Sequence, residues 1–469
     1  MLLDRKNFSL YQIINFLFCL FPISFIIGSL IVNLNLYLFL ILSIIYINKN
    51  NYKFNFDKIK ILLTCFFLFI VLSSIINIYK FDLLLKSISL LRFLILFFVI
   101  EILLLNNKLN LKGLFTTSIL CTSFVAIDVI IQYIFGEDIF GYKPWDGMIA
   151  GPFEHEAIAG SYIQKFSLFS IFSSLFLFKE KNRKQILFLI TLLLLSSAFL
   201  TNNRMSTILF LFSIIILIFI DKKNRVIFFS SLAVFLIIAA FLINRDDSIK
   251  NRYENLYKRF QAQENIENEV KKTVEKKEEE KVFDKKVDPY ESFHFRIYLT
   301  VIESWKNNPI MGWGHKSFRN VCKNITIEKA SCSTHPHNYH LEVLHNTGLV
   351  GFFVISLFVF LILFEIIKKL KNEKFYNITY GVYFIPIAVA IIIEIWPIKS
   401  SGSLFTSWNG TAVWLIISLM AITKINFDKN YLIENEIKQK NTIVLFSIIL
   451  LSSLIIKKIY LYYEFYQYF

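Results

Sequence analysis

The chain has 469 residues, of which 55% are hydrophobic, 17% are aromatic and only 18% are charged. A water-soluble domain of this size could not bury so much apolar surface in one core, so the composition indicates a membrane protein. The formal net charge of +15 does not indicate nucleic-acid binding, because the Lys and Arg residues fall in short clusters between apolar runs.

Runs of about 20 mainly apolar residues, the length that spans a bilayer as a helix, recur along the whole chain. They predict an all-α membrane protein, a polytopic bundle of about 12–13 transmembrane helices. The first run follows Arg5 and Lys6 as in a signal peptide, but no small-residue cleavage site comes after it, so a retained helix is predicted. The runs lie near residues 10–31, 33–48, 60–79, 87–105, 113–135, 157–178, 186–202, 205–221, 226–243, 349–367, 378–396, 410–424 and 441–458.

Positive charge gives the orientation, because Lys and Arg accumulate in short cytoplasmic loops. With the N-terminus inside, alternate connections carry clusters of Lys and Arg, whereas the others are acidic or nearly uncharged. After the last run, Lys457 and Lys458 would emerge on the outer side, so twelve spans fit the rule as well as thirteen. The cytoplasmic clusters are Lys49, Lys53, Lys58 and Lys60; Lys108 and Lys112; Lys179, Lys181, Arg183 and Lys184; Lys222, Lys223 and Arg225; and Lys368, Lys369, Lys371 and Lys374.

One long segment between apolar runs, residues 244–348, falls on the outer side and predicts a large periplasmic loop that contains short helices. It separates N-terminal transmembrane helices in residues 1–243 from C-terminal transmembrane helices in residues 349–469. Within the loop, residues 264–286 are rich in Lys and Glu and predict a solvated helix or a disordered, flexible insert.

The cysteines fall into two groups. Cys322 and Cys332 share the large loop, where an oxidising periplasm would allow them to pair, although the sequence leaves this open. Cys19, Cys65 and Cys121 lie inside apolar segments, where a thiol is usually a packing side chain.

Histidines occur only on the predicted outer side of the membrane. Six of the seven lie in the large loop, so a site built from imidazoles would be extracytoplasmic. In residues 333–351, Pro336 predicts a turn, and Asn338 predicts the N-cap of a short helix that ends at Gly348. The histidines are His155, His294, His315, His335, His337, His340 and His345.

His337 would stand at the start of that short helix, beside the membrane. A neutral imidazole there can take a proton from a sugar hydroxyl as a general base, or it can position the acceptor. Two alternatives stay open: a metal site formed by His335, His337 and His340, and packing at the interface alone. The absence of an Asp or Cys at ligand spacing disfavours the metal site.

Two arginines stand at the predicted outer boundary of the membrane. Arg204 lies at the outer end of a span, and Arg296 lies at the start of an amphipathic segment that runs through Trp305. A pair of guanidiniums at one depth suits a pyrophosphate, since each planar group can bind phosphate oxygens through two hydrogen bonds. The alternative is that both side chains merely extend to lipid phosphates.

Four ionisable residues fall inside predicted spans, where charge is costly and therefore suggests function. Arg92 and Lys165 could line a polar cleft for a lipid phosphate, with Asp128 and Glu394 as their partners. The proton relay of a transporter is the competing explanation.

The pair His337-Asn338, followed after nine residues by Gly348-Leu-Val-Gly351 and preceded by a large outer loop, resembles the O-antigen ligase and polymerase superfamily. The supporting motifs lie in the same order along most of the chain. They are Gln132 with Gly136, residues 151–156, residues 296–299 with Trp305, residues 309–314 and residues 397–403.

The resemblance implies a metal-independent, inverting transfer of a glycan from an undecaprenyl-pyrophosphate carrier, without a cofactor, at the periplasmic face of a bacterial inner membrane. Arg204 and Arg296 would hold the pyrophosphate, and His337 would activate the acceptor hydroxyl. The partners expected are this donor, lipid A core or a growing glycan as acceptor, and membrane lipids, with no nucleic acid. Further residues expected at the substrates are Asn338, His335, His340, Arg92, Lys165 and His155.

The superfamily includes ligases that attach a glycan to lipid A core, polymerases that extend the glycan on its carrier, and transferases that glycosylate proteins. Residues 337–351 are more similar to the ligase pattern, so O-antigen ligation is predicted ahead of polymerisation. A lipid-linked glycan transporter is the alternative from another class. The concentration of polar residues at the outer ends of the spans, rather than along their middles, favours an enzyme.

Overall fold

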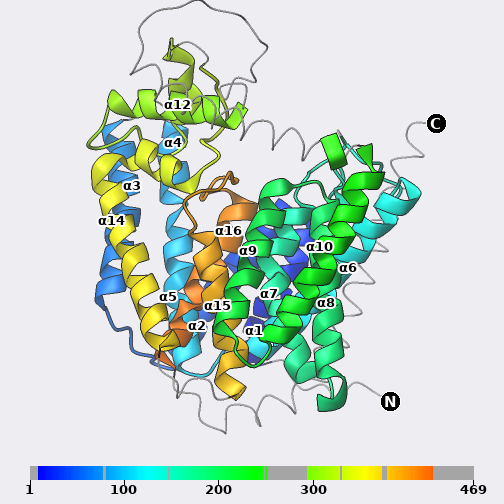
Figure 1. Ribbon diagram of the computed structural model, residues 1–469. Helices are drawn as coiled ribbons and strands as arrows, with labels where there is room; N and C mark the ends of the chain where they lie inside the picture. The colour runs from blue at the N-terminus through cyan, green and yellow to red at the C-terminus, as the bar shows by residue number, and fades with distance from the viewer. Residues whose placement is uncertain are drawn as a thin grey trace, which may run out of the picture.

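The computed structural model describes residues 9–77, 81–145, 147–247, 249–251, 293–327, 330–371 and 378–425. Within these ranges the chain is helical, with a bundle of long helices and a small helical layer above one end (Figure 1). The long helices are α1 (Leu10–Ile27), α2 (Ser29–Lys49), α3 (Lys58–Ile76), α5 (Leu91–Leu105), α6 (Leu111–Phe135), α7 (Ala159–Leu177), α8 (Glu180–Leu200), α9 (Arg204–Ile220), α10 (Arg225–Arg245), α14 (Tyr339–Leu370) and α15 (Ile378–Glu394). Helix α16 (Ser407–Ser418) is shorter and continues into η5. Shorter ones are α4 (Phe81–Ile88), α12 (Phe293–Lys306), α13 (Phe318–Val321), η1 (Gly151–Phe153), η3 (Cys322–Asn324) and η5 (Leu419–Lys424).

Among the described residues, eight helical segments are long and apolar enough to cross a membrane, and α9 and most of α15 form shorter apolar helices. The chain is therefore a multi-pass membrane protein, as predicted from its hydropathy. Helix α7 and the pair α16 and η5 also coincide with predicted spans, although α7 buries the polar Gln164 and Lys165. The predicted span at 441–458 and the charged insert at 264–286 lie outside the described residues.

Helix α7 packs at the centre of the bundle, against α6, α8, α9 and α15. The ring of its Phe169 contacts Phe166 one turn earlier and Phe115 of α6. Phe115 also meets Tyr383 of α15. These buried aromatic side chains hold the inner helices together, whereas apolar side chains such as Phe360 of α14 are exposed and are suited to face lipid.

Helix α14 differs from its prediction, because it begins before the expected span and is broken inside. Asn338 caps it as predicted, accepting a hydrogen bond from the Leu341 amide. Gly348, predicted to end a short helix, has φ 62° and ψ −162°, and the chain then continues as helix to Leu370. The predicted short helix and the predicted span at 349–367 are therefore two parts of one kinked helix.

Residues 309–314 form a turn against this break in α14. The amide of Leu349, which has no helical partner at the kink, donates to the Pro309 carbonyl at 2.8 Å. In the other direction, the Trp313 amide donates to the His345 carbonyl at 2.9 Å. The motif in this stretch thus satisfies backbone groups that a broken helix would otherwise leave unpaired near the membrane.

Replacing Gly348 by Ala should destabilise the protein by about 2 kcal/mol or more, because this backbone conformation is nearly exclusive to glycine and an added Cβ would collide with Ile310. The matched control is Gly381→Ala in α15, where a Cβ meets only an ordinary contact with Ile385 at 3.6 Å. Thermal unfolding in detergent should show a lower midpoint for Gly348→Ala alone. Equal midpoints in the two variants would contradict a glycine-dependent kink.

Candidate functional site

A cavity of about 790 Å³ opens at the end of the bundle where α9 and α14 begin. Its lining comes from the N-terminal half of α7, the starts of α9, α12 and α14, and the loop between α15 and α16. The Lys-rich connections after α7, α9 and α14 lie at the opposite end of these helices (Figure 1). The cavity is therefore on the side that the charge pattern predicts to be outer.

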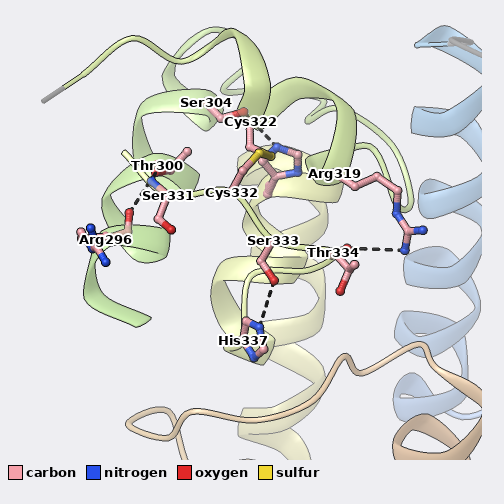
Figure 2. The surroundings of a disulfide bond; sticks show 11 residues. Arg296, Thr300, Ser304, Arg319, Cys322, Ser331, Cys332, Ser333, Thr334 and His337 are labelled. Atoms are coloured by element: carbon pink, nitrogen blue, oxygen red, sulfur yellow. Dashed lines mark hydrogen bonds between the residues drawn. A yellow bond between two sulfur atoms is a disulfide. The ribbon is translucent and has the colours of Figure 1, made fainter. Parts of the chain in front are cut away.

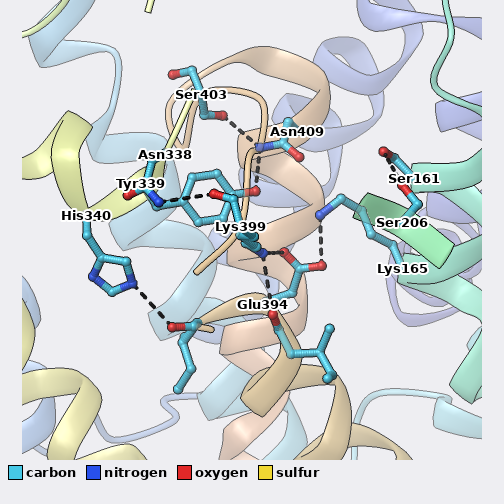
Figure 3. A network of polar contacts seen from close by, with 12 residues as sticks. Ser161, Lys165, Ser206, Asn338, Tyr339, His340, Glu394, Lys399, Ser403 and Asn409 are labelled. Atoms are coloured by element: carbon cyan, nitrogen blue, oxygen red, sulfur yellow. Dashed lines mark hydrogen bonds and ion pairs between the residues drawn. The ribbon is translucent and has the colours of Figure 1, made fainter. Parts of the chain in front are cut away.

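Three cationic side chains line this outer cavity, and within the described ranges no carboxylate does. Lys165 comes from α7, Arg204 from α9 and Lys399 from the α15–α16 loop. Glu394 lies behind the two lysines: it accepts from Lys165 Nζ at 2.9 Å and from Lys399 Nζ at 3.2 Å (Figure 3). One carboxylate cannot neutralise two ammonium groups, so the outer cavity keeps an excess of positive charge.

The network around Glu394 is almost completely buried. The side chains of Lys165 and Lys399 are each 4% exposed, and that of Glu394 is 0% exposed. Burial, together with the Lys165 ammonium, lowers the pKa of Lys399 to about 8 although Glu394 opposes the shift. The sequence names Asp128 and Glu394 as possible partners of Arg92 and Lys165 without saying which would pair. It shows Lys399 only as part of the motif at 397–403, because nothing local links that lysine to a buried carboxylate.

His337 lies at the outer cavity and is held through its backbone. Its φ of 56° is uncommon for a residue other than glycine, and its carbonyl accepts from the Ser401 amide at 2.8 Å. Its Nε2 lies 3.1 Å from Ser333 Oγ (Figure 2). The rings of His335 and His294 flank it, with centroids 4.0 Å and 5.0 Å away.

These surroundings keep His337 uncharged. Burial, followed by the influence of His335 and His294, lowers the pKa of His337 to about 3. A neutral imidazole can accept a proton, but so low a pKa makes it a weak base. A diphosphate bound in the outer cavity would favour the charged imidazolium and raise this pKa. The arrangement therefore suits an imidazole that orients a hydroxyl and becomes a stronger base when an anionic substrate is bound.

Asn338 and His340 fasten the α15–α16 loop to the start of α14. Asn338 Nδ2 donates to the carbonyls of Pro397 at 2.9 Å and Lys399 at 3.0 Å. His340 Nε2 lies 3.3 Å from the Ile395 carbonyl. Both side chains therefore position the loop that carries Lys399, and Asn338 also lines the outer cavity.

Arg204 is the first residue of α9. Asn203 caps this helix by accepting from the Ser206 amide at 3.3 Å. Asn202 ties the same turn to an outer loop, donating to the Gly147 carbonyl at 2.9 Å. Because the start of a helix carries partial positive charge, α9 adds its own field to that of the guanidinium and favours an anion here.

Five of the residues expected at the substrates do not line the outer cavity: Arg296, Arg92, His155, His335 and His340. Arg296 is two residues from Tyr298, which does line it, and two residues turn a helix by about 200°. The arginine therefore projects from another flank of α12 than the one that lines the cavity. Arg92 instead donates to the Tyr37 hydroxyl at 3.2 Å. Substrate contacts for these five residues stay predictions.

A disulfide joins Cys322 and Cys332, the pairing that the sequence left open, with Cα atoms 5.5 Å apart (Figure 2). Cys322 belongs to a small buried cluster with Ile297 and Val301 of α12. The chain leads from Cys332 directly to Ser333, so the disulfide fixes the segment that brings the Ser333 hydroxyl to the imidazole of His337.

The histidines of the loop do not converge as metal ligands. In the parts of the chain that the structure describes, no group of three His, Cys, Asp or Glu side chains is arranged to hold a metal ion. The rings of His335 and His337 pack against each other, whereas the His340 ring lies within hydrogen-bond distance of the Ile395 carbonyl.

The fold and this cationic cavity define a multi-pass membrane protein with a polar site at one end of its helices. A family model described as O-antigen ligase matches residues 189–356, the segment that contains Arg204, α12 and His337. The match supports the O-antigen ligase superfamily, so the family predicted from the motifs is confirmed. It indicates O-antigen ligase or polymerase-type glycan transfer in general. No curated protein matches the chain.

Replacing His337 by Asn should weaken the pH dependence of stability. The folded protein holds the pKa of His337 at about 3, below the usual 6.5, so stability is lost as the pH falls below about 6.5 and the unfolded chain takes up the proton. Asn tolerates a positive φ and does not titrate. Thermal midpoints at about pH 7 and about pH 4.5 should therefore differ less in His337→Asn than in the wild type.

His155→Asn is the control for this experiment, because it removes an outer imidazole that does not line the cavity. It should keep the wild-type difference between the two pH values. If His337→Asn keeps the full wild-type difference between the two midpoints, the inference that the fold lowers the pKa of His337 is wrong.

Proposed function

We propose that the protein transfers an undecaprenyl-pyrophosphate-linked glycan to an acceptor hydroxyl at the periplasmic face of the bacterial inner membrane, as an O-antigen ligase acting on lipid A core. The observation that carries this proposal is the outer cavity, where three cations and no described carboxylate stand beside a neutral imidazole. A diphosphate leaving group requires the positive charge of the cations. A hydroxyl nucleophile requires the neutral imidazole, which can accept its proton. The family match supports glycan transfer of this general type.

In the proposed reaction, the acceptor oxygen forms a bond to the anomeric carbon as the bond from that carbon to the diphosphate oxygen breaks. The hydroxyl proton passes to His337, and undecaprenyl pyrophosphate leaves. This single displacement inverts the anomeric configuration. Negative charge grows on the diphosphate during the step, so the fixed cations Arg204 and Lys399 stabilise the transition state more than the bound donor. The proposal is metal-independent and uses no cofactor, because these side chains supply the positive charge.

Two observations support an extracytoplasmic site. The outer cavity lies at the end of the helices opposite to the Lys-rich connections, which collect in the cytoplasm. The disulfide between Cys322 and Cys332 lies in the layer beside this cavity, and such bonds are typical of oxidising compartments.

In this proposal the other predicted residues contact the donor, line the outer cavity or act from its surroundings. Arg296 would contact the donor from the flank of α12, where its buried Nε has no hydrogen-bond partner among the described residues. Lys165 and Asn338 line the outer cavity directly. The residues that would act from its surroundings are His335, His340, His155 and Arg92.

Arg204→Ala and Lys399→Gln should each lower the rate of glycan transfer by about 100-fold or more, because each removes a fixed charge that faces the developing diphosphate. Arg204→Lys and Lys399→Arg should retain part of the activity. The assay measures transfer of a labelled glycan from a purified lipid-linked donor by the purified variants. Arg245→Ala, which removes a guanidinium stacked on Phe241 at the end of α10, is the matched control and should remain fully active. Full activity of both charge-removing variants would eliminate the proposed mechanism.

The acceptor is tested by incubating the purified protein with the lipid-linked donor alone and with donor plus lipid A core. A ligase forms product only when the core is present. A ladder of growing chains from donor alone would instead establish the polymerase alternative, and transfer to a protein acceptor would establish a protein O-oligosaccharyltransferase. Donor binding without transfer in any arm would fit a transporter and would overturn the enzymatic proposal.

A further inference from the structure

A second cavity, of about 600 Å³, lies at the other end of the helices that carry the outer cavity. It is enclosed by the end of α7, the start of α8, the turn between α9 and α10, the end of α14 and the start of α15. These are the connections that the charge pattern predicts to be cytoplasmic. No described residue lines both cavities, so we treat this inner cavity as a separate site.

The inner cavity is divided into an apolar interior and a basic rim. Phe172 and Leu187 are fully buried at its base, and Leu175, Val382 and Ile385 continue the apolar wall. The rim carries five cations, contributed by three different connections. They are Arg183, Lys184, Lys222, Lys223 and Lys371.

The acidic residues at the rim do not cancel this charge. Asp221 is one of two carboxylates among the described residues of the lining. It is already engaged, accepting from the Asn224 amide at 3.2 Å and from the Asn224 side chain at 2.8 Å. The other, Glu180, is exposed at the first position of α8. Within the described ranges, none of the five rim cations forms an ion pair.

Two other cations on this side, Lys60 and Lys424, are held in ion pairs, unlike those at the rim. Lys60 and Lys424 both contact Glu101 at 2.9 Å. A requirement for positive charge in cytoplasmic connections explains the number of lysines but not their gathering around one cavity. Helices α8 and α10 also begin at the inner cavity, and their partial positive charges add to the field at the rim.

We propose that the inner cavity binds an anionic phospholipid of the cytoplasmic leaflet, with the headgroup phosphate among the rim cations and acyl chain on the apolar base. The cavity stands where apolar helices end, which is the depth of lipid headgroups. Basic pockets between transmembrane helices on this side are suited to anionic headgroups. A free phosphate would use the rim but leave the apolar base without a partner, so the shape of the site favours a lipid. This proposal does not depend on the transfer function.

The test measures lipid binding to the full-length protein, purified and delipidated in detergent, by native mass spectrometry. Phosphatidylglycerol should bind at least about tenfold more tightly than phosphatidylcholine. The double variant Lys222→Gln with Lys223→Gln should weaken phosphatidylglycerol binding about 30-fold, the effect of removing two cations near a lipid phosphate. The matched control, Lys49→Gln with Lys53→Gln, removes the same charge from a connection that does not line the inner cavity and should leave binding within about twofold.

A second variant tests the apolar base with all charges kept. Val382→Trp should fill part of the apolar interior of the inner cavity and also weaken phosphatidylglycerol binding at least about tenfold. Binding by unspecific attraction to surface lysines would not change in this variant. An excess of inorganic phosphate should not displace the lipid. Equal binding of the two lipids, equal weakening in the control double variant, unchanged binding in Val382→Trp or displacement by phosphate would each overturn the proposal. Thermal unfolding verifies that the variants are folded.

Discussion

The carboxylate of Glu394, shared by Lys165 and Lys399, is the contact on which the outer end of the protein depends. An unpaired charge inside an apolar bundle is strongly unfavourable, so α7 cannot shift against α15, and the α15–α16 loop cannot lift away, without leaving a charge uncompensated. Glu342 of α14 anchors the same loop, accepting from the Ser403 hydroxyl at 2.5 Å. The cations of the outer cavity are therefore held in place before any substrate arrives.

The sequence predicts those features that depend on local composition or on the membrane itself. The spans follow from hydropathy, because lipid demands an apolar length that a single run of residues must supply. The cap at Asn338 follows from a side chain that can accept from the next helical turn. That Lys165 has a carboxylate partner is predictable because a charge inside a bilayer needs one, although the sequence does not choose between Asp128 and Glu394. His337 and Arg204 stand out because both lie at the boundary of a span.

Other features depend on tertiary contacts that no local pattern reveals. The helix continues through Gly348 because a distant turn at 309–314 supplies the hydrogen bonds that the kink removes. From the sequence alone, a glycine at this position predicts the end of a helix. Lys399 joins the site only because the loop folds back over Glu394. Arg296 has the expected position in the chain, but the packing of α12 through Ile297 decides which flank faces the cavity.

The two cavities show why two groups of cations in one protein can have different roles. In the outer cavity, Lys165 and Lys399 are buried and fixed by one carboxylate, so little reorganisation is needed when charge develops on a bound diphosphate, and this is the condition under which electrostatics accelerates a reaction. At the inner cavity, lysines such as Lys222 and Lys223 are exposed on flexible stems and keep their hydration. Such charges attract an anionic headgroup but are not preorganised around a reacting atom, so the same helices can hold a reactive site at one end and a lipid at the other.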